Sequence, residues 1–467
     1  MPSMQNSKYP ESCRCGSSRS GRTLRAILRV TFILLIVPSV MQATPLSLGD
    51  ACQYARTHDA QLRSAEADVS ISNEEVGKAV SAFKPSIRAS VSRGRNRTES
   101  ITSYSPKGYE TFYNTLSNSV SIRQELFNMQ DIFAYRQSKA VRAKSESLLN
   151  GERTGVMVRT AEVFFNVLYA QDNVEFTESQ RRATAEQLAQ ARRRYRDGFG
   201  TITEINEAQA SYDMAIAEEA SGVTGLDFAR RELERITGVS ADELCRLKPE
   251  RMHPEPLMPD NVNDWINTAI EGNAKILAAR QDIQIARREI DKSRASRLPT
   301  VELVAGRSYS VSETNYTIGS IYDTWSISLQ VNVPIYSGGY TSAAVRQSVA
   351  RRIKADDQYD LTERTVASEV RKYYNGVLNG MVQVRAYEQA VRSNEIALEG
   401  TRKGFGAGIR SNVDVLNAQQ KMFDSRRNLA KARYLYILNR LLLKDAVGIL
   451  TDDDIAEVNR WFSNSRL

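Results

Sequence analysis

The sequence predicts a mainly helical α+β fold made of two similar halves, each with a helix, two strands and a long helical hairpin. Three observations predict it. Segments of the first half recur about 210 residues later. Long proline-free stretches carry apolar residues at the three- and four-residue spacing of helices. Between them lie shorter stretches that alternate apolar and polar residues, which is the period of a β-strand.

The first 43 residues are predicted to be an export signal that precedes the fold. They hold six Lys or Arg and one Glu, and end in an apolar run, Val30–Val40, and a few further residues. This run is too short for a membrane-spanning helix, which takes ~20 residues. Without the signal, 57 basic and 54 acidic residues remain, so the net charge falls from +8 to +3. The basic excess belongs mostly to the signal, whose exact cleavage site the sequence leaves open.

Few residues offer catalytic or metal-binding chemistry. The two histidines, His58 and His253, lie beside no cysteine or carboxylate cluster, and the chain has no phosphate-binding or nucleophile motif. Two of the four cysteines fall in the signal, and whether Cys52 and Cys245 pair is left open. Runs of arginine alternate with acids along predicted helices, as on a solvated face. We therefore expect no enzyme, no cofactor, no metal and no nucleic-acid partner.

The internal repeat is clearest at a turn motif. Residues 195–209, YRDGFGTITEINEAQ, recur at 405–419 as FGAGIRSNVDVLNAQ. Four prolines within residues 249–259 form the seam between the halves, because a chain so rich in proline does not continue a helix. We therefore predict a first repeat over 44–248, a proline-rich linker over 249–262, a second repeat over 263–450 and a C-terminal tail over 451–467.

The helical stretches are too long for a single globular domain. The chain from Leu126 to Gly198 has one weak spot, at Gly151 and Gly155, and would form a helix about 100 Å long. Such helices need partner helices along their length, so we expect an elongated coiled coil. The last helix carries a heptad-like apolar set: Val413, Leu416, Phe423, Ala430, Tyr434, Ile437 and Leu441.

Two predicted strand pairs lie between the helices, joined by predicted loops over 93–111 and 307–321. Each predicted strand has one apolar face and one face of small or polar residues. This pattern fits a strand that lies between lipid and water, although an ordinary half-buried sheet has the same pattern. Four strands cannot close a barrel within one chain, so closure would come from other subunits. The alternating apolar residues are Ile87, Ala89, Val91, Phe112, Leu116, Val120, Ile122, Val301, Leu303, Ala305, Trp325, Ile327, Leu329, Val331 and Val333.

These features together resemble the TolC family of outer-membrane channel proteins, the exit ducts of type I secretion and efflux systems. The resemblance covers roughly residues 46–450 and is most specific in the doubled turn motif. Leu126-Phe127-Asn128 and Pro334-Ile335-Tyr336-Ser337-Gly338-Gly339 also look like the family's junctions between strand and helix. The resemblance implies a homotrimer that contacts lipid in the outer membrane of a Gram-negative bacterium, with a shared 12-stranded barrel and a periplasmic helical tunnel.

The resemblance also places a gate at the periplasmic tip, where the two glycine turns contain Gly198 and Gly408. Arg410 occupies the position of the family's gate arginine. Glu204, which follows Thr203, occupies the position of its acidic partner. An arginine facing a carboxylate across neighbouring helices would make a charge-assisted pair that can break without exposing apolar surface.

Three further positions in the resemblance modify this gate. Phe405 stands where the best-known channel has a tyrosine, so one hydrogen bond to the acid would be missing. Asp414 would contribute to a carboxylate ring across the pore, and Asn417 replaces the acid of a second ring. The alternative is that Asp414 and Glu204 only begin the helices after each turn, where acids complement the helix dipole.

The resemblance favours an exit duct for type I protein or toxin secretion, working with an inner-membrane ABC transporter or other pump and a periplasmic adaptor. The predicted mature chain lacks a lipid-attachment cysteine near its start, a feature that many drug-efflux members carry. Two alternatives stay open: the outer-membrane component of a multidrug efflux pump, and a periplasmic coiled-coil structural protein. The sequence identifies neither the cargo nor the particular pump and adaptor.

Overall fold

The computed structural model describes residues 45–252, 255–312 and 320–462, all within one compact unit, Thr44–Leu467. The predicted export signal and His253 lie outside the described residues. The first half contains α1 (Leu48–His58), α2 (Ala60–Ser81), β1 (Ser86–Thr102), β2 (Ser105–Phe127), α3 (Met129–Arg196) and α4 (Ile202–Thr237). The second half contains α5 (Val262–Gly272), α6 (Ala274–Ala295), β3 (Thr300–Ser312), β4 (Ser320–Asn332), α7 (Tyr340–Gly406) and α8 (Asn412–Val447).

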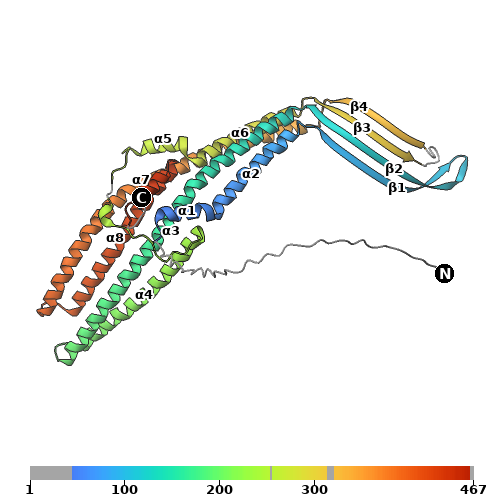
Figure 1. Ribbon diagram of the computed structural model, residues 1–467. Helices are drawn as coiled ribbons and strands as arrows, with labels where there is room; N and C mark the ends of the chain where they lie inside the picture. The colour runs from blue at the N-terminus through green and yellow to red at the C-terminus, as the bar shows by residue number, and fades with distance from the viewer. Residues whose placement is uncertain (1–44, 253–254, 313–319, 463–467) are drawn as a thin grey trace, which may run out of the picture. The chain divides into compact units, whose positions relative to one another are not determined.

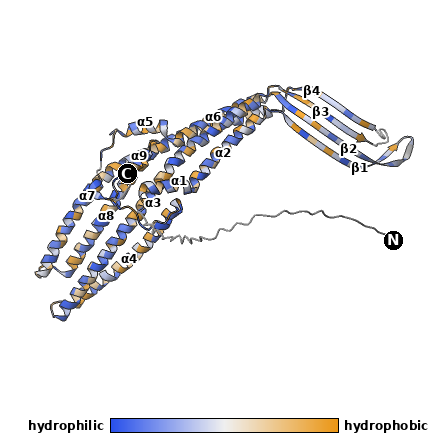
Figure 2. Ribbon diagram, viewed as in Figure 1, coloured by the Kyte–Doolittle hydropathy of each residue, from blue (hydrophilic) through white to orange (hydrophobic). Residues whose placement is uncertain are grey.

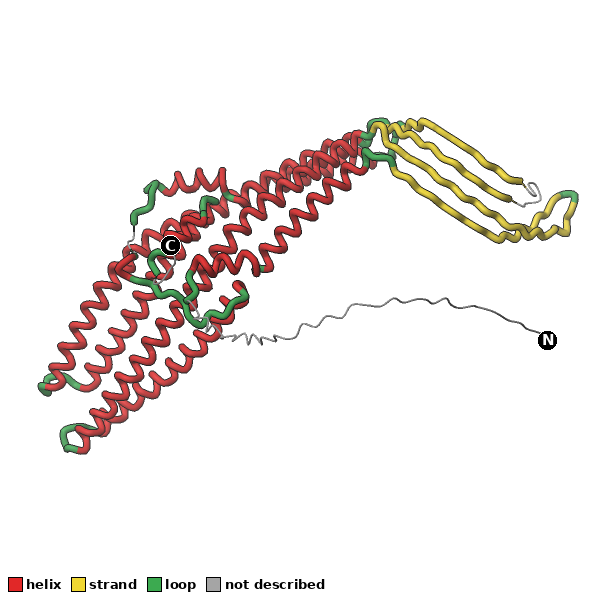
Figure 3. The backbone as a smooth tube through the Cα atoms, in the orientation of Figure 1, coloured by secondary structure: helices red, strands yellow, loops and turns green. Residues whose placement is uncertain are grey.

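The two halves repeat the same order of elements, two short helices, two strands and two long helices, which confirms the predicted duplicated fold (Figure 1). A 3₁₀ turn, Pro249–Arg251, lies in the proline-rich seam. After α8, the short helix α9 (Asp452–Asn459) ends the described chain. The strands lie at one end of the long helices and the α3–α4 and α7–α8 turns at the other (Figure 3).

The four strands form one antiparallel sheet in the order β1-β2-β3-β4. Residues directly opposite each other share a face, and Ser90, Ser119 and Ser308 lie opposite one another on the polar face. Hydropathy alternates along the strands in Figure 2. We call the other side the apolar face; it is defined by Ile87, Ala89, Val91, Val120, Ile122, Leu303, Ala305, Trp325, Ile327, Leu329 and Val331.

The strands are longer than predicted, because both expected loops are largely replaced by sheet. β1 and β2 stay paired from Ser86↔Arg123 to Thr102↔Ser105, so the expected loop over 93–111 is wrong. β3 and β4 pair as far as Ser312↔Ser320, which also shortens the expected loop over 307–321. In the first of these regions both faces carry polar side chains, so the ladder of backbone hydrogen bonds continues where the alternation of hydropathy has stopped.

The long helices confirm the predicted coiled coil. α3 has 68 residues and α7 has 67, which corresponds to about 100 Å each. Six of the seven predicted heptad positions of α8 are buried, and Val413 is half-buried. Gly151 does not interrupt α3; a Cβ there would lie 2.7 Å from the Cβ of Ala274, so the glycine permits the close approach of α6.

The main core lies where α1, α3, α8 and the end of the chain meet. The rings of Phe164 and Phe165 pack against Phe462, with centroids 6.1 Å apart in both pairs. Phe165 also stacks on Tyr434 of α8. Cys52 and Cys245 are both buried and both free, so the disulfide that the sequence left open is not formed.

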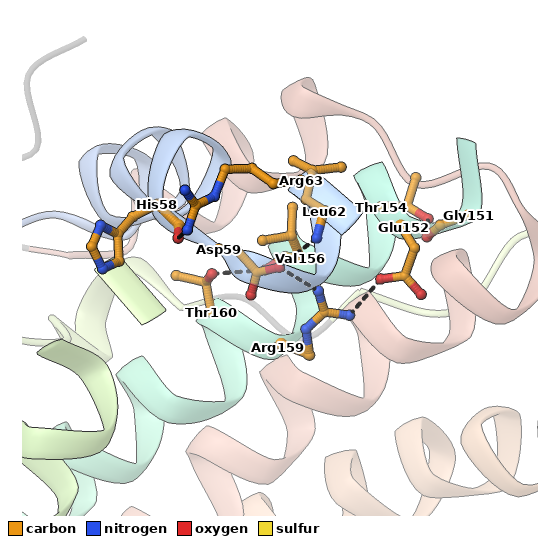
Figure 4. Close-up of polar contacts among 10 residues, drawn as sticks. All are labelled: His58, Asp59, Leu62, Arg63, Gly151, Glu152, Thr154, Val156, Arg159 and Thr160. Atoms are coloured by element: carbon orange, nitrogen blue, oxygen red, sulfur yellow. Dashed lines mark hydrogen bonds and ion pairs between the residues drawn. The ribbon is translucent and has the colours of Figure 1, made fainter. Parts of the chain in front are cut away.

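A buried ion pair fixes the junction between α1 and α2 against α3 (Figure 4). Asp59 is 7 % exposed, and its Oδ1 accepts the backbone N–H of Leu62 at 2.8 Å as the N-cap of α2. The Arg159 guanidinium lies 3.1 Å from Asp59 and 3.0 Å from Glu152. Arg159 therefore compensates a carboxylate that is largely shielded from water.

Replacement of Arg159 by methionine is expected to lower the free energy of unfolding by about 3 kcal/mol, because it leaves the Asp59 carboxylate buried without its cation. Urea titration of the detergent-solubilised protein measures this loss. The double variant Arg159→Met, Asp59→Asn is expected to recover much of it, since asparagine still caps α2 without a charge. A double variant no more stable than Arg159→Met would contradict the assignment to the unpaired charge.

A second titratable group lies in the first turn of α3, where the sheet joins the helices. Burial and contact with the Glu125 carboxylate raise the pKa of Asp131 to about 6, while Asn128 and Lys292 oppose the rise. The folded protein therefore binds the Asp131 proton more tightly than the unfolded chain does. The stabilisation from this proton is present below the ordinary carboxyl pKa and is lost as the pH rises through about 6.

Replacement of Asp131 by asparagine is accordingly expected to stabilise the protein at pH 8 and to have little effect near pH 4, because the amide stays neutral throughout. Thermal melting of wild type and variant across this range measures the difference. A variant whose advantage is the same at both ends of the range would exclude titration of Asp131 as the cause.

Candidate functional site at the helical tips

The turns that join α3 to α4 and α7 to α8 have the same backbone geometry. Gly198 and Gly408 adopt φ values of 80° and 74°, in the left-handed region that favours glycine. The N–H groups of Gly198 and Gly408 donate to the carbonyls of Tyr195 and Phe405, each at 3.1 Å. The doubled motif in the sequence therefore folds into two equivalent tips.

Each turn ends in a helix cap. The Thr201 hydroxyl accepts the backbone N–H of Glu204 at 3.2 Å, and Ser411 forms a capping box with Asp414. The backbone N–H and hydroxyl of Ser411 donate to the Asp414 carboxylate at 2.9 Å, and together with Arg410 they lower the pKa of Asp414. Asp414 thus begins α8 and also stays ionised at the tip.

Phe405 connects the two hairpins. Its ring is 5 % exposed and packs with Leu398, Val415 and Phe423 of its own hairpin. The guanidinium of Arg194, from the end of α3, lies over this ring at 4.6 Å from the centroid. A cation–π contact therefore joins the α3–α4 hairpin to the α7–α8 hairpin at Phe405, the position that the resemblance aligns with a tyrosine.

The interface between the hairpins contains polar as well as apolar contacts. Gln180 donates to Gln420 at 2.9 Å, and Arg427 lies 3.7 Å from Glu218. Other buried side-chain atoms of these two hairpins have no hydrogen-bond partner among the described residues. They belong to Gln187, Arg194, Glu204, Asn412 and Gln419. Since unpaired buried polar atoms cost free energy, the hairpins are held together less firmly than an apolar interface of this size would hold them.

The predicted gate residues are near the tips but are not all brought together. Arg410 and Thr203 are exposed, and within the described part of the chain no ion pair joins Arg410 to Glu204. Asn417 lines a cleft of about 350 Å³ among α3, α4 and α8. The sequence did not single out Arg194 or Gln419 as functional: a run of three arginines resembles a solvated face, and Gln419 belongs to the doubled turn motif, which indicates a turn but no contact for the glutamine.

Among the described helices, none is both long enough and apolar enough to cross a membrane. The arrangement as a whole defines a class of protein. An antiparallel sheet with an exposed apolar face stands at one end of paired long helices, and two equivalent turns stand at the other. This is the architecture of an outer-membrane channel protein with a helical periplasmic part.

The chain belongs to the outer membrane efflux protein family, whose model matches residues 51–239 and 265–449. It is therefore an outer-membrane protein of the TolC type, and a channel rather than an enzyme, as the resemblance implied. Similar proteins include the proteases secretion protein PrtF of Dickeya chrysanthemi, which is 30 % identical over 94 % of this chain and 96 % of its own length.

The alkaline protease secretion protein AprF of Pseudomonas aeruginosa is 31 % identical over 93 % of this chain and 91 % of its own length. Among solved structures, the CmeC outer membrane channel of Campylobacter jejuni superposes with a TM-score of 0.75 at 16 % identity, covering 89 % of this chain and 90 % of that one. The structural match confirms the predicted fold class.

Proposed function

We propose that this channel is the outer-membrane exit duct of a type I protein secretion system, working with an inner-membrane ABC transporter and a periplasmic adaptor. The observation that carries the proposal is that two relatives named for protease secretion match it over more than nine-tenths of its length. The alternative is the outer-membrane component of a multidrug efflux pump, which the description of the family favours.

Deleting the gene and assaying both secreted proteins and drug susceptibility separates these two functions. We expect the loss of one or more secreted proteins with little change in drug susceptibility. Drug hypersensitivity with an unchanged set of secreted proteins would favour efflux instead. A purified protein that raised no conductance in planar bilayers would contradict both and favour a coiled-coil structural protein.

We also propose that three chains close one barrel. β1 and β4 each have one neighbour in the four-stranded sheet, so each leaves an edge of unpaired backbone groups. Pairing β1 of one copy with β4 of the next satisfies both edges. Light scattering of the detergent-solubilised protein, corrected for bound detergent, is expected to give three times the mass of the chain; a monomer would exclude this closure.

The tips offer a contact for the adaptor. Phe199 and Ile409 occupy equivalent positions in the two turns, and each is 80 % exposed. Large apolar side chains that are exposed to water at equivalent positions indicate a surface for contact with another protein. We assign this paired apolar surface to the adaptor.

Arg410 is proposed as a gate residue through its charge, beside the ionised Asp414 at the tip. Arg410→Ser is expected to raise the resting conductance severalfold, because it removes a cation that attracts this carboxylate and any ion pair that Arg410 makes across the closed tip. Single-channel recording measures the change. Unchanged conductance, together with unchanged antibiotic leakage in cells, would remove Arg410 from the gate.

A further inference from the structure

The apolar face of the sheet contains a groove. It has a volume of about 800 Å³ and includes Ala89, Val91, Ile122, Ala305, Trp325 and Ile327 in its lining. Ala89 and Ala305 are small, whereas Trp325 and Ile327 on β4 are large and exposed. The small side chains beside the large ones leave this face hollowed rather than flat, and apolar side chains predominate in the lining, which also includes Arg307 and Asn118.

Arginines continue the same face of β1 directly beyond this groove. Arg93, Arg95 and Arg97 follow Val91 at two-residue spacing, so the strand period places all three on the apolar face. The equivalent positions of the opposite face, Ser92 and its alternate neighbours, carry no charge. The basic residues therefore continue this face of β1 beyond its apolar run, and Leu116 and Phe112 of β2 stand beside Arg93 and Arg97.

The cations on this face of the sheet differ in whether they have partners. Arg97 pairs with Glu110. Arg307, opposite Trp325 in the sheet, donates to Asp323 at 2.7 and 2.9 Å and lies 5.1 Å from the centre of the Trp325 ring. In contrast, Arg93 and Arg95 are exposed and have no carboxylate partner in the described part of the chain.

We propose that Arg93 and Arg95 bind the phosphate groups of a phosphorylated glycolipid whose acyl chain lies in the groove. Planar guanidinium groups bind phosphate through two parallel hydrogen bonds. Two of them about 7 Å apart along one strand reach separate oxygens of the headgroup region. The proposal rests on the proposed function, because it requires the apolar face to stand in the bilayer. It adds a lipid class and the residues that select it.

The test is binding of lipid A to the full-length protein in detergent, followed by native mass spectrometry. The variant Arg93→Gln, Arg95→Gln is expected to bind lipid A about 30-fold more weakly. Each arginine near an anionic lipid surface strengthens binding about 5-fold, and the variant removes two of them. Dephosphorylated lipid A is expected to bind wild type as weakly as lipid A binds the double variant. Inorganic phosphate alone is expected not to saturate the site.

Arg88→Gln is the matched control, because Arg88 is exposed on the same strand but on the opposite face. It should leave lipid binding unchanged. An equal loss in Arg88→Gln, undiminished binding by the double variant, or equal binding of the dephosphorylated lipid would overturn the proposal. Loss of the oligomer without loss of lipid binding would show that these arginines contact a second copy instead. Planar-bilayer conductance of the wild type tests the channel separately.

Discussion

Replacing Arg194 with alanine is expected to raise the resting conductance of the channel. The Arg194 guanidinium over the Phe405 ring is a direct contact between the two hairpins at the tip. Such a contact, partly removed from water, contributes about 1–2 kcal/mol. If the hairpins separate when the tip opens, the loss shifts the equilibrium towards the open state about 5- to 30-fold. Single-channel recording in planar bilayers measures this shift as a longer open time.

Arg193→Ala is the matched control, because Arg193 is the exposed neighbour in the same run of arginines. It should leave the conductance unchanged. Phe405→Leu keeps an apolar side chain in the core of the tip but removes the ring, and should open the channel to a similar degree. The double variant Arg194→Ala, Phe405→Leu should then add little to either single change. Additive effects of the two changes would show that the arginine acts through another partner, such as the Phe199 carbonyl.

The helices and turns could be predicted because their signals are local. Each long helix ends in a left-handed backbone turn that favours glycine, which accounts for Gly198 and Gly408. The next helix then begins at an N-cap that favours Thr or Ser, which accounts for Thr201 and Ser411. The duplication doubled each signal, so each half supported the interpretation of the other. β1 could not be bounded in this way beyond Val91, because its residues there are polar on both faces and backbone pairing continues the strand. In β3 the alternation continues beyond Arg307 at Tyr309 and Val311, within a segment whose polar composition indicated a loop.

The contacts between hairpins could not be predicted, because they join residues far apart in the chain. Arg194 and Phe405 are separated by 211 positions. Neither the charge of Arg194 nor the ring of Phe405 indicates which residue it contacts. The predicted pair of Arg410 and Glu204 came from the resemblance alone. In the single chain Arg410 lies near Asp414, whereas one Glu204 oxygen is buried without a partner among the residues that the structure describes. A gate between subunits would supply contacts that one chain does not contain.

Replacing Gln419 with methionine should have the opposite effect and hold the channel closed. Gln419 is 2 % exposed, and neither its amide nitrogen nor its oxygen has a hydrogen-bond partner in the described part of the chain. Burying such an amide costs about 1–3 kcal/mol. Methionine has a similar length and no atom that requires a hydrogen bond, so the interface of α8 with α3 and α4 becomes more stable. Open time and secretion should both fall by about tenfold.

Gln420→Met provides the contrast, since Gln420 is exposed and accepts a hydrogen bond from Gln180 at 2.9 Å. That change removes a contact between α3 and α8, so it should leave the channel unchanged or open it slightly. Arg194→Ala combined with Gln419→Met should return the conductance towards that of wild type, because the two changes act in opposite directions on the same separation of hairpins. If Gln419→Met opened the channel, the Gln419 amide would have to make hydrogen bonds in the closed channel that it loses when the hairpins separate. The polar interface would then fasten the tip rather than loosen it.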